Sequence, residues 1–309
     1  MNVAVVDIGS NSTRLLIAEI EDHRVRRELV RHSEVTRLGA GVDADGRLRD
    51  DAMQRVYTTL DGYKAEIDEH GAQAAVAVLT SAVRDSANGQ EFADTVRDRY
   101  GLEPHVLSGD EEAELTFLGA TSERDASDRT PTLVLDIGGG STEMIIGSGG
   151  EVGFHVSTQA GVVRQTERHL HADPPDPAEM EALAADARGI LEAAVPTDRR
   201  GEVQHGIAVA GTATSLAAIA QHLDPYDPER VHGYLLSSGE CDRILGELAA
   251  MTLEERRQVA GLHPDRAPTI VAGVLIFREV LRLFGLSRIE ISEHDILRGA
   301  ALGLAAPGL

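Results

Sequence analysis

Short apolar runs alternate with longer amphipathic segments along most of the chain. In residues 50–70, Val56, Leu60 and Ile67 recur near helical spacing, which predicts an amphipathic helix. The same reasoning predicts further helices at about 90–100, 111–119, 161–169, 178–195, 238–251, 267–284 and 295–305, and strands at about 74–79, 103–107, 154–157, 206–210 and 288–292. Because strands alternate with helices in both halves, we expect an α/β fold with helices covering the sheets.

One pattern occurs twice. The run Val3–Arg14 recurs as Thr132–Glu143, at an offset of 129 residues, and both copies carry Asp, Ile, Gly, Ser and Thr at matching positions. Each copy joins two apolar runs through a polar, glycine-containing turn, which predicts a β-hairpin. Two copies so far apart indicate two similar domains rather than a solenoid, whose periods are shorter. The polar stretch Thr121–Arg129 is the predicted boundary, giving domains 1–126 and 127–309, with the last helix a candidate to pack back on the first.

Composition excludes several classes of protein. The 309 residues suffice for about two domains. The single lysine, Lys64, does not lie in a P-loop motif, and the single Cys241 excludes an internal disulfide framework. A net charge of −22 opposes general binding to nucleic acid or to anionic membranes. Without a charged leader or an apolar run of about 18 residues, a soluble cytoplasmic protein is expected.

Both turns are suited to phosphate. Glycines let backbone N–H groups approach an anion closely, hydroxyl and amide groups add hydrogen bonds, and a leading aspartate can hold hydrated Mg²⁺. One copy alone could equally be an ordinary hairpin turn, but two matched copies favour phosphate binding. The candidate phosphate-binding residues of the turns are Asp7, Gly9, Ser10, Asn11, Ser12, Gly138, Gly139, Gly140, Ser141 and Thr142.

Five motifs together resemble the exopolyphosphatase and guanosine pentaphosphate phosphohydrolase (Ppx/GppA) family, over nearly the whole chain. They are Asp7–Ser12, Thr80–Asp85, Ser108–Ala113, Asp136–Glu143 and Gly211–Thr214. The resemblance implies duplicated RNase H-like domains of the actin-like ATPase superfamily, with the substrate in an interdomain cleft. Longer family members carry additional helical domains at the C-terminus, so the chain resembles the short two-domain form.

The resemblance also assigns roles to individual residues. Glu112 matches the family's catalytic glutamate, and a carboxylate there could orient the attacking water. Without the resemblance, its neighbours Asp110 and Glu111 would be equal candidates. Arg84 matches an arginine that meets phosphate, although a surface ion pair with Asp85 is an alternative. At the two turns, the resemblance implies that Asp7, Asp136 and Glu143 are metal ligands and that Glu143 is also catalytic.

The expected activity is a Mg²⁺-dependent, processive exopolyphosphatase that releases orthophosphate from inorganic polyphosphate, with Mn²⁺ as an alternative metal. Alternatives are a pppGpp 5′-phosphohydrolase, a sugar or acetate kinase, and a non-catalytic sensor of (p)ppGpp or polyphosphate. A homodimer and a role in the stringent response are expected from the resemblance alone, and no nucleic-acid or membrane partner is expected.

Two further segments are candidates for binding anions. Gly211, Thr212 and Thr214 follow a predicted strand and open a helix, where a nucleotide or another anion could bind. The segment His23–Arg37 has a local excess of arginine, which could guide a polyphosphate chain or could simply form cross-strand ion pairs. Arg164 is a weaker phosphate candidate, whereas Gly261–Arg266 is expected to be structural.

Overall fold

The computed structural model describes residues 1–125 and 127–304, which form two compact units. Unit 1 contains Met1–Ser122 together with the described residues from Asp295 to Leu304, and unit 2 contains Glu123–His294. The chain thus leaves unit 1 close to the boundary predicted at 126/127. The prediction counted the residues after His294 with the second domain and let the last helix pack on the first, and the structure groups them with unit 1.

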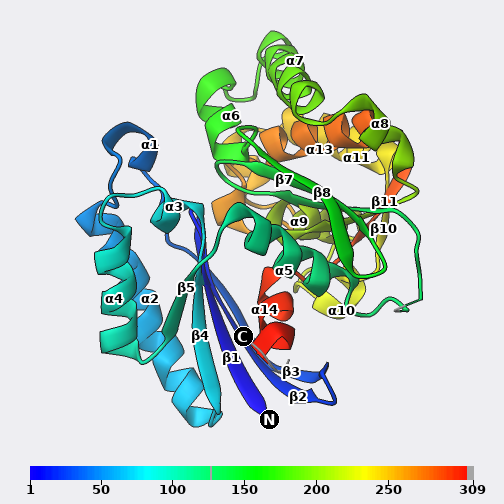
Figure 1. Cartoon of the computed structure of the whole chain (residues 1–309). Coiled ribbons are helices and arrows are strands. Elements are labelled where there is room, and N and C mark those ends of the chain that lie inside the picture. Colours follow the sequence, from blue (N-terminus) through cyan, green and yellow to red (C-terminus); the bar gives the residue numbers. More distant parts are fainter. Residues whose placement is uncertain (126, 305–309) are drawn as a thin grey trace. The chain divides into compact units, whose positions relative to one another are not determined.

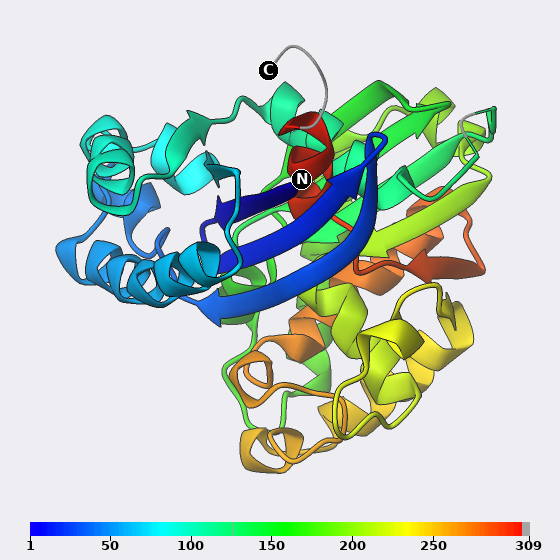
Figure 2. The same cartoon turned by 90° about the horizontal axis from the view of Figure 1, so that it is seen from below.

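The sheet of unit 1 has the strand order β3-β2-β1-β4-β5. Strands β1, β2 and β3 form an antiparallel meander, seen side by side in blue in Figure 2, and β4 and β5 run parallel to β1. The bounds are β1 (Asn2–Ile8), β2 (Ser12–Glu21), β3 (Arg24–Val35), β4 (Ala74–Leu79) and β5 (Glu103–Val106).

Helices cover both faces of this sheet (Figure 1). They are α1 (Val42–Asp45), α2 (Asp50–Glu69), α3 (Ser81–Arg84), α4 (Gly89–Tyr100), α5 (Gly109–Thr121) and α14 (Ile296–Leu304). Apolar side chains of α2 and α4, such as Leu60 and Phe92, pack on one face, and Leu297 of α14 packs on the other. Helices α14 and α5 touch backbone to backbone, because a Cβ at Gly299 would lie 1.8 Å from the Leu115 carbonyl oxygen. Glycine at this crossing therefore holds α14 in unit 1.

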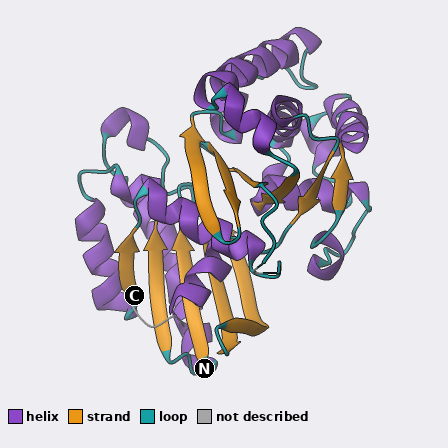
Figure 3. Ribbon diagram, turned by 45° about the vertical axis from the view of Figure 1, so that its right-hand side comes forward, coloured by secondary structure: helices purple, strands orange, loops and turns teal. Residues whose placement is uncertain are grey.

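Unit 2 repeats the same strand order with one additional edge strand, β8-β7-β6-β9-β11-β10. Strands β6, β7 and β8 form the meander, β11 runs parallel to β9 and β9 to β6, and β10 is antiparallel to β11. Figure 3 shows the strands of both sheets in orange. The bounds are β6 (Thr132–Ile137), β7 (Thr142–Ser148), β8 (Glu151–Thr158), β9 (His205–Val209), β10 (Leu235–Ser237) and β11 (Arg288–Ile291). This repetition confirms the expected duplicated α/β architecture. The expected cleft between the domains depends on how the units are placed and stays a prediction.

Unit 2 has one large apolar core, which includes Leu133, Leu216 and Phe277. Its helices are α6 (Val162–His169), α7 (Pro177–Ala194), α8 (Thr197–Glu202), α9 (Ala210–Ala220), α10 (Pro228–Val231), α11 (Ser238–Ala249), α12 (Leu253–Arg256), the 3₁₀ helix η1 (Pro264–Arg266) and α13 (Ile270–Phe284). Within the described residues, no helix is long and apolar enough to span a membrane.

Most predicted helices and strands lie where the hydrophobic pattern placed them, but the strand β3 and several short elements were not predicted. Helices α8, α10 and α12 and strand β10 have only three to six residues each, too few to show a period. Helix α9 begins at Ala210, which the pattern assigned to the preceding strand. The last predicted helix, 295–305, is described from Ile296 to Leu304, and residue 305 lies outside the described residues.

Candidate active site

The first candidate phosphate turn, Gly9–Ser12, is held by hydrogen bonds from the chain that follows β3. The Gly9 amide donates to the Ser12 carbonyl oxygen at 3.0 Å and closes the turn between β1 and β2. The Asn11 carbonyl oxygen accepts from the amides of Thr36 and Arg37, and the Ser10 carbonyl oxygen accepts from the Gly39 amide. A Cβ at Gly39 would lie 2.9 Å from the Ser10 Cβ, so only glycine fits closely there. Gly39 is not among the site residues predicted from the sequence.

The candidate residues of unit 1 gather at the carboxyl ends of its parallel strands, the usual ligand edge of α/β sheets. The hydroxyls of Ser10, after β1, and Ser81, after β4, lie 3.0 Å apart. On the next strand connection, the Arg84 Nη1 donates to the Glu112 carboxylate at 3.3 Å and to the Leu107 carbonyl oxygen at 2.8 Å. The structure therefore brings the predicted Arg84 and Glu112 together.

The two neighbouring glutamates at the start of α5 do different things. Glu111 closes a capping box with Ser108, whose amide donates to the Glu111 carboxylate at 2.8 Å. This hydrogen bond lowers the pKa of Glu111 below its usual range. Glu112 is instead the partner of Arg84, which also lies 3.4 Å from Asp85. The geometry thus separates Glu112 from Glu111, which sequence chemistry alone could not do.

Asp7 is buried beside Arg14 rather than open to solvent. The two residues are direct cross-strand neighbours on β1 and β2, and Arg14 Nε donates to Asp7 at 2.8 Å. Arg14 also forms an ion pair with Asp295, which caps the start of α14. Burial raises the pKa of Asp7, while Arg14 opposes that rise. One Asp7 oxygen, Oδ1, is buried and has no hydrogen-bond partner among the described residues.

The second turn, Gly138–Ser141, has the same closure. The Gly138 amide donates to the Ser141 carbonyl oxygen at 2.9 Å, and the turn carbonyls of Gly138 and Gly139 accept from the first amides of α6. A Cβ at Gly161 would lie 2.1 Å from the Gly140 carbonyl carbon. Gly161 is therefore the counterpart of Gly39, since both glycines follow the third strand of a meander and support a turn. That shared position is the sequence signal that could have found them.

Asp136 and Glu143 occupy in unit 2 the register positions that Asp7 and Arg14 occupy in unit 1. Side chains directly opposite on antiparallel strands have Cβ atoms roughly 4.5–5.5 Å apart, and two like charges there destabilise the pair. Ser157 on β8 donates to Glu143 Oε1 at 2.8 Å. Two neighbouring carboxylates are a donor set that fits Mg²⁺, which prefers oxygen ligands. The Asp7 carboxylate also offers oxygen atoms to a metal ion, but it already forms an ion pair with Arg14.

At the start of α9 the predicted hydroxyls serve the fold. Thr212 is buried and donates to the Ile137 carbonyl oxygen at 3.2 Å, and Thr214 lies 3.5 Å from the Gly211 carbonyl oxygen. Arg266 Nη1 donates to the Gly211 carbonyl oxygen at 2.8 Å and to Ser215 Oγ at 3.0 Å. Arg266, which the sequence reasoning assigned a structural role, thus places a cation beside the candidate anion site.

The arginine-rich strand β3 carries local ion pairs. Arg26 pairs with Glu21 and Arg31 pairs with Glu28. The Arg26–Glu21 pair joins β3 to β2 and fits the alternative of cross-strand ion pairing, whereas the Arg31–Glu28 pair lies within β3. Guidance of polyphosphate stays a prediction. Arg164 lies in α6, where its amide meets the Gly139 carbonyl oxygen at 3.4 Å.

Comparison with known proteins gives matches over nearly the full length. The model of the Ppx/GppA phosphatase family matches residues 16–304. "Exopolyphosphatase 2" of Mycobacterium tuberculosis is 38% identical over 315 residues, covering 98% of each chain. The crystal structure of the Aquifex aeolicus member of the Ppx/GppA family is 30% identical with a TM-score of 0.85, covering 99% of this chain and 97% of that one. The crystal structure of an exopolyphosphatase from Cytophaga hutchinsonii is 29% identical with a TM-score of 0.86, covering 98% and 97%. The chain therefore belongs to the Ppx/GppA phosphatase family.

Proposed function

We propose that this phosphoanhydride hydrolase is an exopolyphosphatase, which removes terminal orthophosphate from inorganic polyphosphate. The relatives support the general activity, since one named exopolyphosphatase is 38% identical over nearly all of both chains. The observation that carries the residue assignment is the contact of Arg84 with Glu112 at the carboxyl edge of the unit 1 sheet.

In this proposal Glu112 is the group that orients and deprotonates the attacking water. Its carboxylate is partly exposed, with a side-chain exposure of 25%, so a water can reach it. The Arg84 guanidinium 3.3 Å away holds that carboxylate in place and offers its remaining donors to phosphate oxygens. A positioned carboxylate of this kind typically contributes 10²–10⁴-fold, an order-of-magnitude range, to the rate.

The turns are proposed to bind phosphate through backbone amides and hydroxyls. Ser10 and Ser81 present two hydroxyls 3.0 Å apart, next to the turn amides of Gly9–Ser12. The Gly138–Ser141 turn offers a similar set in unit 2. Asp136 and Glu143 would hold Mg²⁺, with Mn²⁺ as an alternative, and the ion when bound would neutralise phosphate charge. Processive action and a homodimer are part of the same proposal.

A second candidate substrate is pppGpp, whose terminal phosphate is also a phosphoanhydride. Arg266 at Gly211 favours it, because a cation beside a helix start could bind the additional phosphates of such a nucleotide. A role in the stringent response belongs to this alternative.

One assay separates these readings. Orthophosphate release is measured from long-chain polyphosphate, pppGpp and ATP, each with and without Mg²⁺. We expect Mg²⁺-dependent release from polyphosphate at the highest kcat/KM. A higher kcat/KM for pppGpp would favour the second candidate, and binding without release from any substrate would leave only a sensor.

A further inference from the structure

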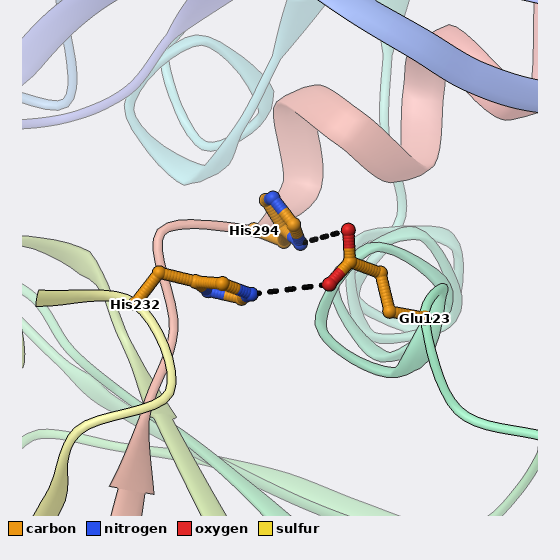
Figure 4. A group of neighbouring side chains, drawn as sticks. All are labelled: Glu123, His232 and His294. Atoms are coloured by element: carbon orange, nitrogen blue, oxygen red, sulfur yellow. Dashed lines mark hydrogen bonds and ion pairs between the residues drawn. The ribbon is translucent and has the colours of Figure 1, made fainter. Parts of the chain in front are cut away.

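Three side chains of types that can ligate a metal ion cluster in unit 2, and none of them belongs to the phosphate turns. Glu123, His232 and His294 present ligand atoms that all lie within 4.8 Å of one another (Figure 4). We propose that these residues form a binding site for a divalent transition metal ion, with Zn²⁺ as the preferred ion. The proposal concerns a site outside the proposed hydrolytic reaction and does not depend on it.

The distances between the ligand atoms are close to those of a tetrahedrally coordinated metal ion. Zn²⁺ bonds to imidazole nitrogen and carboxylate oxygen at about 2.0–2.2 Å, so neighbouring ligand atoms in a tetrahedron lie about 3.3 Å apart. The His232 Nε2 lies 3.2 Å from Glu123 Oε2, and the His294 Nδ1 lies 3.9 Å from Glu123 Oε1. The two imidazole rings are adjacent, with centroids 4.1 Å apart. The two distances run to different Glu123 oxygens, so one ion would bind either both oxygens or one of them after a side-chain rotation.

The ligand types favour zinc over magnesium. Two imidazoles and one carboxylate suit Zn²⁺, Co²⁺ or Ni²⁺, whereas Mg²⁺ prefers oxygen ligands. His294 is buried, with an exposed fraction of 9%, while 56% of the Glu123 side chain is exposed. Water can therefore reach the solvent side of the cluster and complete the coordination as a fourth ligand.

Ser292 contacts both histidines, the ring of His232 and the backbone of His294. Its hydroxyl lies 3.4 Å from the His232 Nδ1 and accepts from the His294 amide at 2.9 Å. The Glu293 amide donates to the same His232 Nδ1 at 3.3 Å, an arrangement that favours the neutral tautomer with its proton on Nε2, 3.2 Å from Glu123 Oε2. With a metal ion on Nε2, the ring proton would lie on Nδ1, where it would donate to the Ser292 hydroxyl in place of the present hydrogen bond from the Glu293 amide. Such a hydrogen bond to the distal ring nitrogen is the usual support for a metal-bound histidine.

The position of the cluster suggests what the ion does. Glu123 is the first residue of unit 2 and His294 is the last, and His232 lies just before β10. A bound ion would link the first and last residues of unit 2 to His232, which lies in the middle of its sequence. We expect it to stabilise the folded unit by preferential binding to the native state.

The test is metal binding to the full chain, with any affinity tag removed and metal stripped by a chelator. Isothermal titration with ZnCl₂ should show one ion per chain, and Mg²⁺ in excess should not displace it. Glu123→Gln, His232→Ala and His294→Ala should each weaken Zn²⁺ binding at least tenfold. His263→Ala is the matched control, since this exposed histidine has one acidic neighbour, Asp265, at 3.9 Å but is not part of the cluster. It should bind Zn²⁺ like the wild type.

Co²⁺ provides a second readout, because its visible absorption reports tetrahedral coordination by nitrogen and oxygen. Thermal unfolding without metal checks that each variant folds. If the buried His294→Ala does not fold, the exposed Glu123→Gln decides the question. Absence of saturable Zn²⁺ binding, or equal affinity in Glu123→Gln and the wild type, would overturn the proposal and leave the cluster as a metal-free group of ion pairs.

Discussion

Asp136 and Glu143 face each other across β6 and β7, in the register in which Asp7 faces Arg14 across β1 and β2. The duplicated hairpin therefore carries an ion pair in one unit and a pair of carboxylates in the other. Arg14 pairs with both Asp7 and Asp295, whereas Asp136 and Glu143 are two like charges on facing positions, an arrangement that favours binding of a cation.

The carboxylate pair predicts how Glu143→Gln changes metal dependence. Removing one charge weakens the attraction for a divalent cation, so the Mg²⁺ concentration for half-maximal activity should rise at least tenfold. Steady-state phosphate release against Mg²⁺ concentration measures this. Glu151→Gln, which removes an exposed carboxylate at the start of β8, is the control and should behave like the wild type. Wild-type Mg²⁺ dependence in Glu143→Gln would remove Glu143 from the site.

The packing of Gly161 predicts that Gly161→Ala damages the second turn. The new Cβ would meet the backbone of Gly140 at 2.1 Å, so the turn must move. We expect kcat/KM for polyphosphate to fall at least tenfold and stability to fall by about 1–3 kcal/mol. Gly189→Ala in α7 is the control, because nothing lies within 4 Å of its added Cβ. That variant should be as active as the wild type and slightly more stable, by about 0.5–1 kcal/mol. Unchanged activity in Gly161→Ala would show that the turn does not take part.

Glu279 predicts a stability effect in unit 2. Its side chain is 1% exposed and meets Arg188 at 2.9 Å and Arg282 at 2.8 Å. Glu279→Gln should destabilise the protein by about 2 kcal/mol, because the charge-assisted hydrogen bonds to the arginines are lost. Hydration of the partly exposed arginines keeps the cost from being larger. Denaturant unfolding measures this. Glu247→Gln removes the exposed Arg243–Glu247 pair and should cost under about 0.5 kcal/mol. Equal effects of the two changes would contradict this account of Glu279.

Cys241 should be chemically inert in the folded protein. It is fully buried in α11, and burial raises the pKa of its thiol to about 12. Since the thiolate is the reactive form, almost none is present at pH 8, and its fraction rises only as the pH approaches that pKa. A thiol reagent at pH 8 should therefore label the native chain slowly and the denatured chain quickly. Rapid labelling under native conditions would show that α11 opens readily.

The sequence was informative where a pattern repeats. The Asp7 and Asp136 turns were recognisable because each joins two apolar strands, and long helices such as α2 have several turns over which a period can show. Short elements such as β10 were not, because three residues carry no period.

The residues that position the candidate site were harder to predict from the sequence. Gly39 and Gly161 act through close backbone approach, which depends on chain segments that meet only in the folded protein. The choice of Glu112 over Glu111 needed either a family resemblance or the coordinates, because both glutamates suit the first turn of a helix equally well. Arg266 meets Gly211 from a distant loop, and no local pattern signals that contact.

The central claim is that Glu112 performs the chemistry of phosphate release while its neighbour caps the helix. The most direct test compares kcat for phosphate release from polyphosphate in Glu112→Gln and Glu111→Gln. Gln retains the capping box at position 111, so Glu111→Gln should keep near wild-type kcat. Glu112→Gln should lose about 10²–10⁴-fold while remaining folded. Near wild-type kcat in Glu112→Gln would contradict the account.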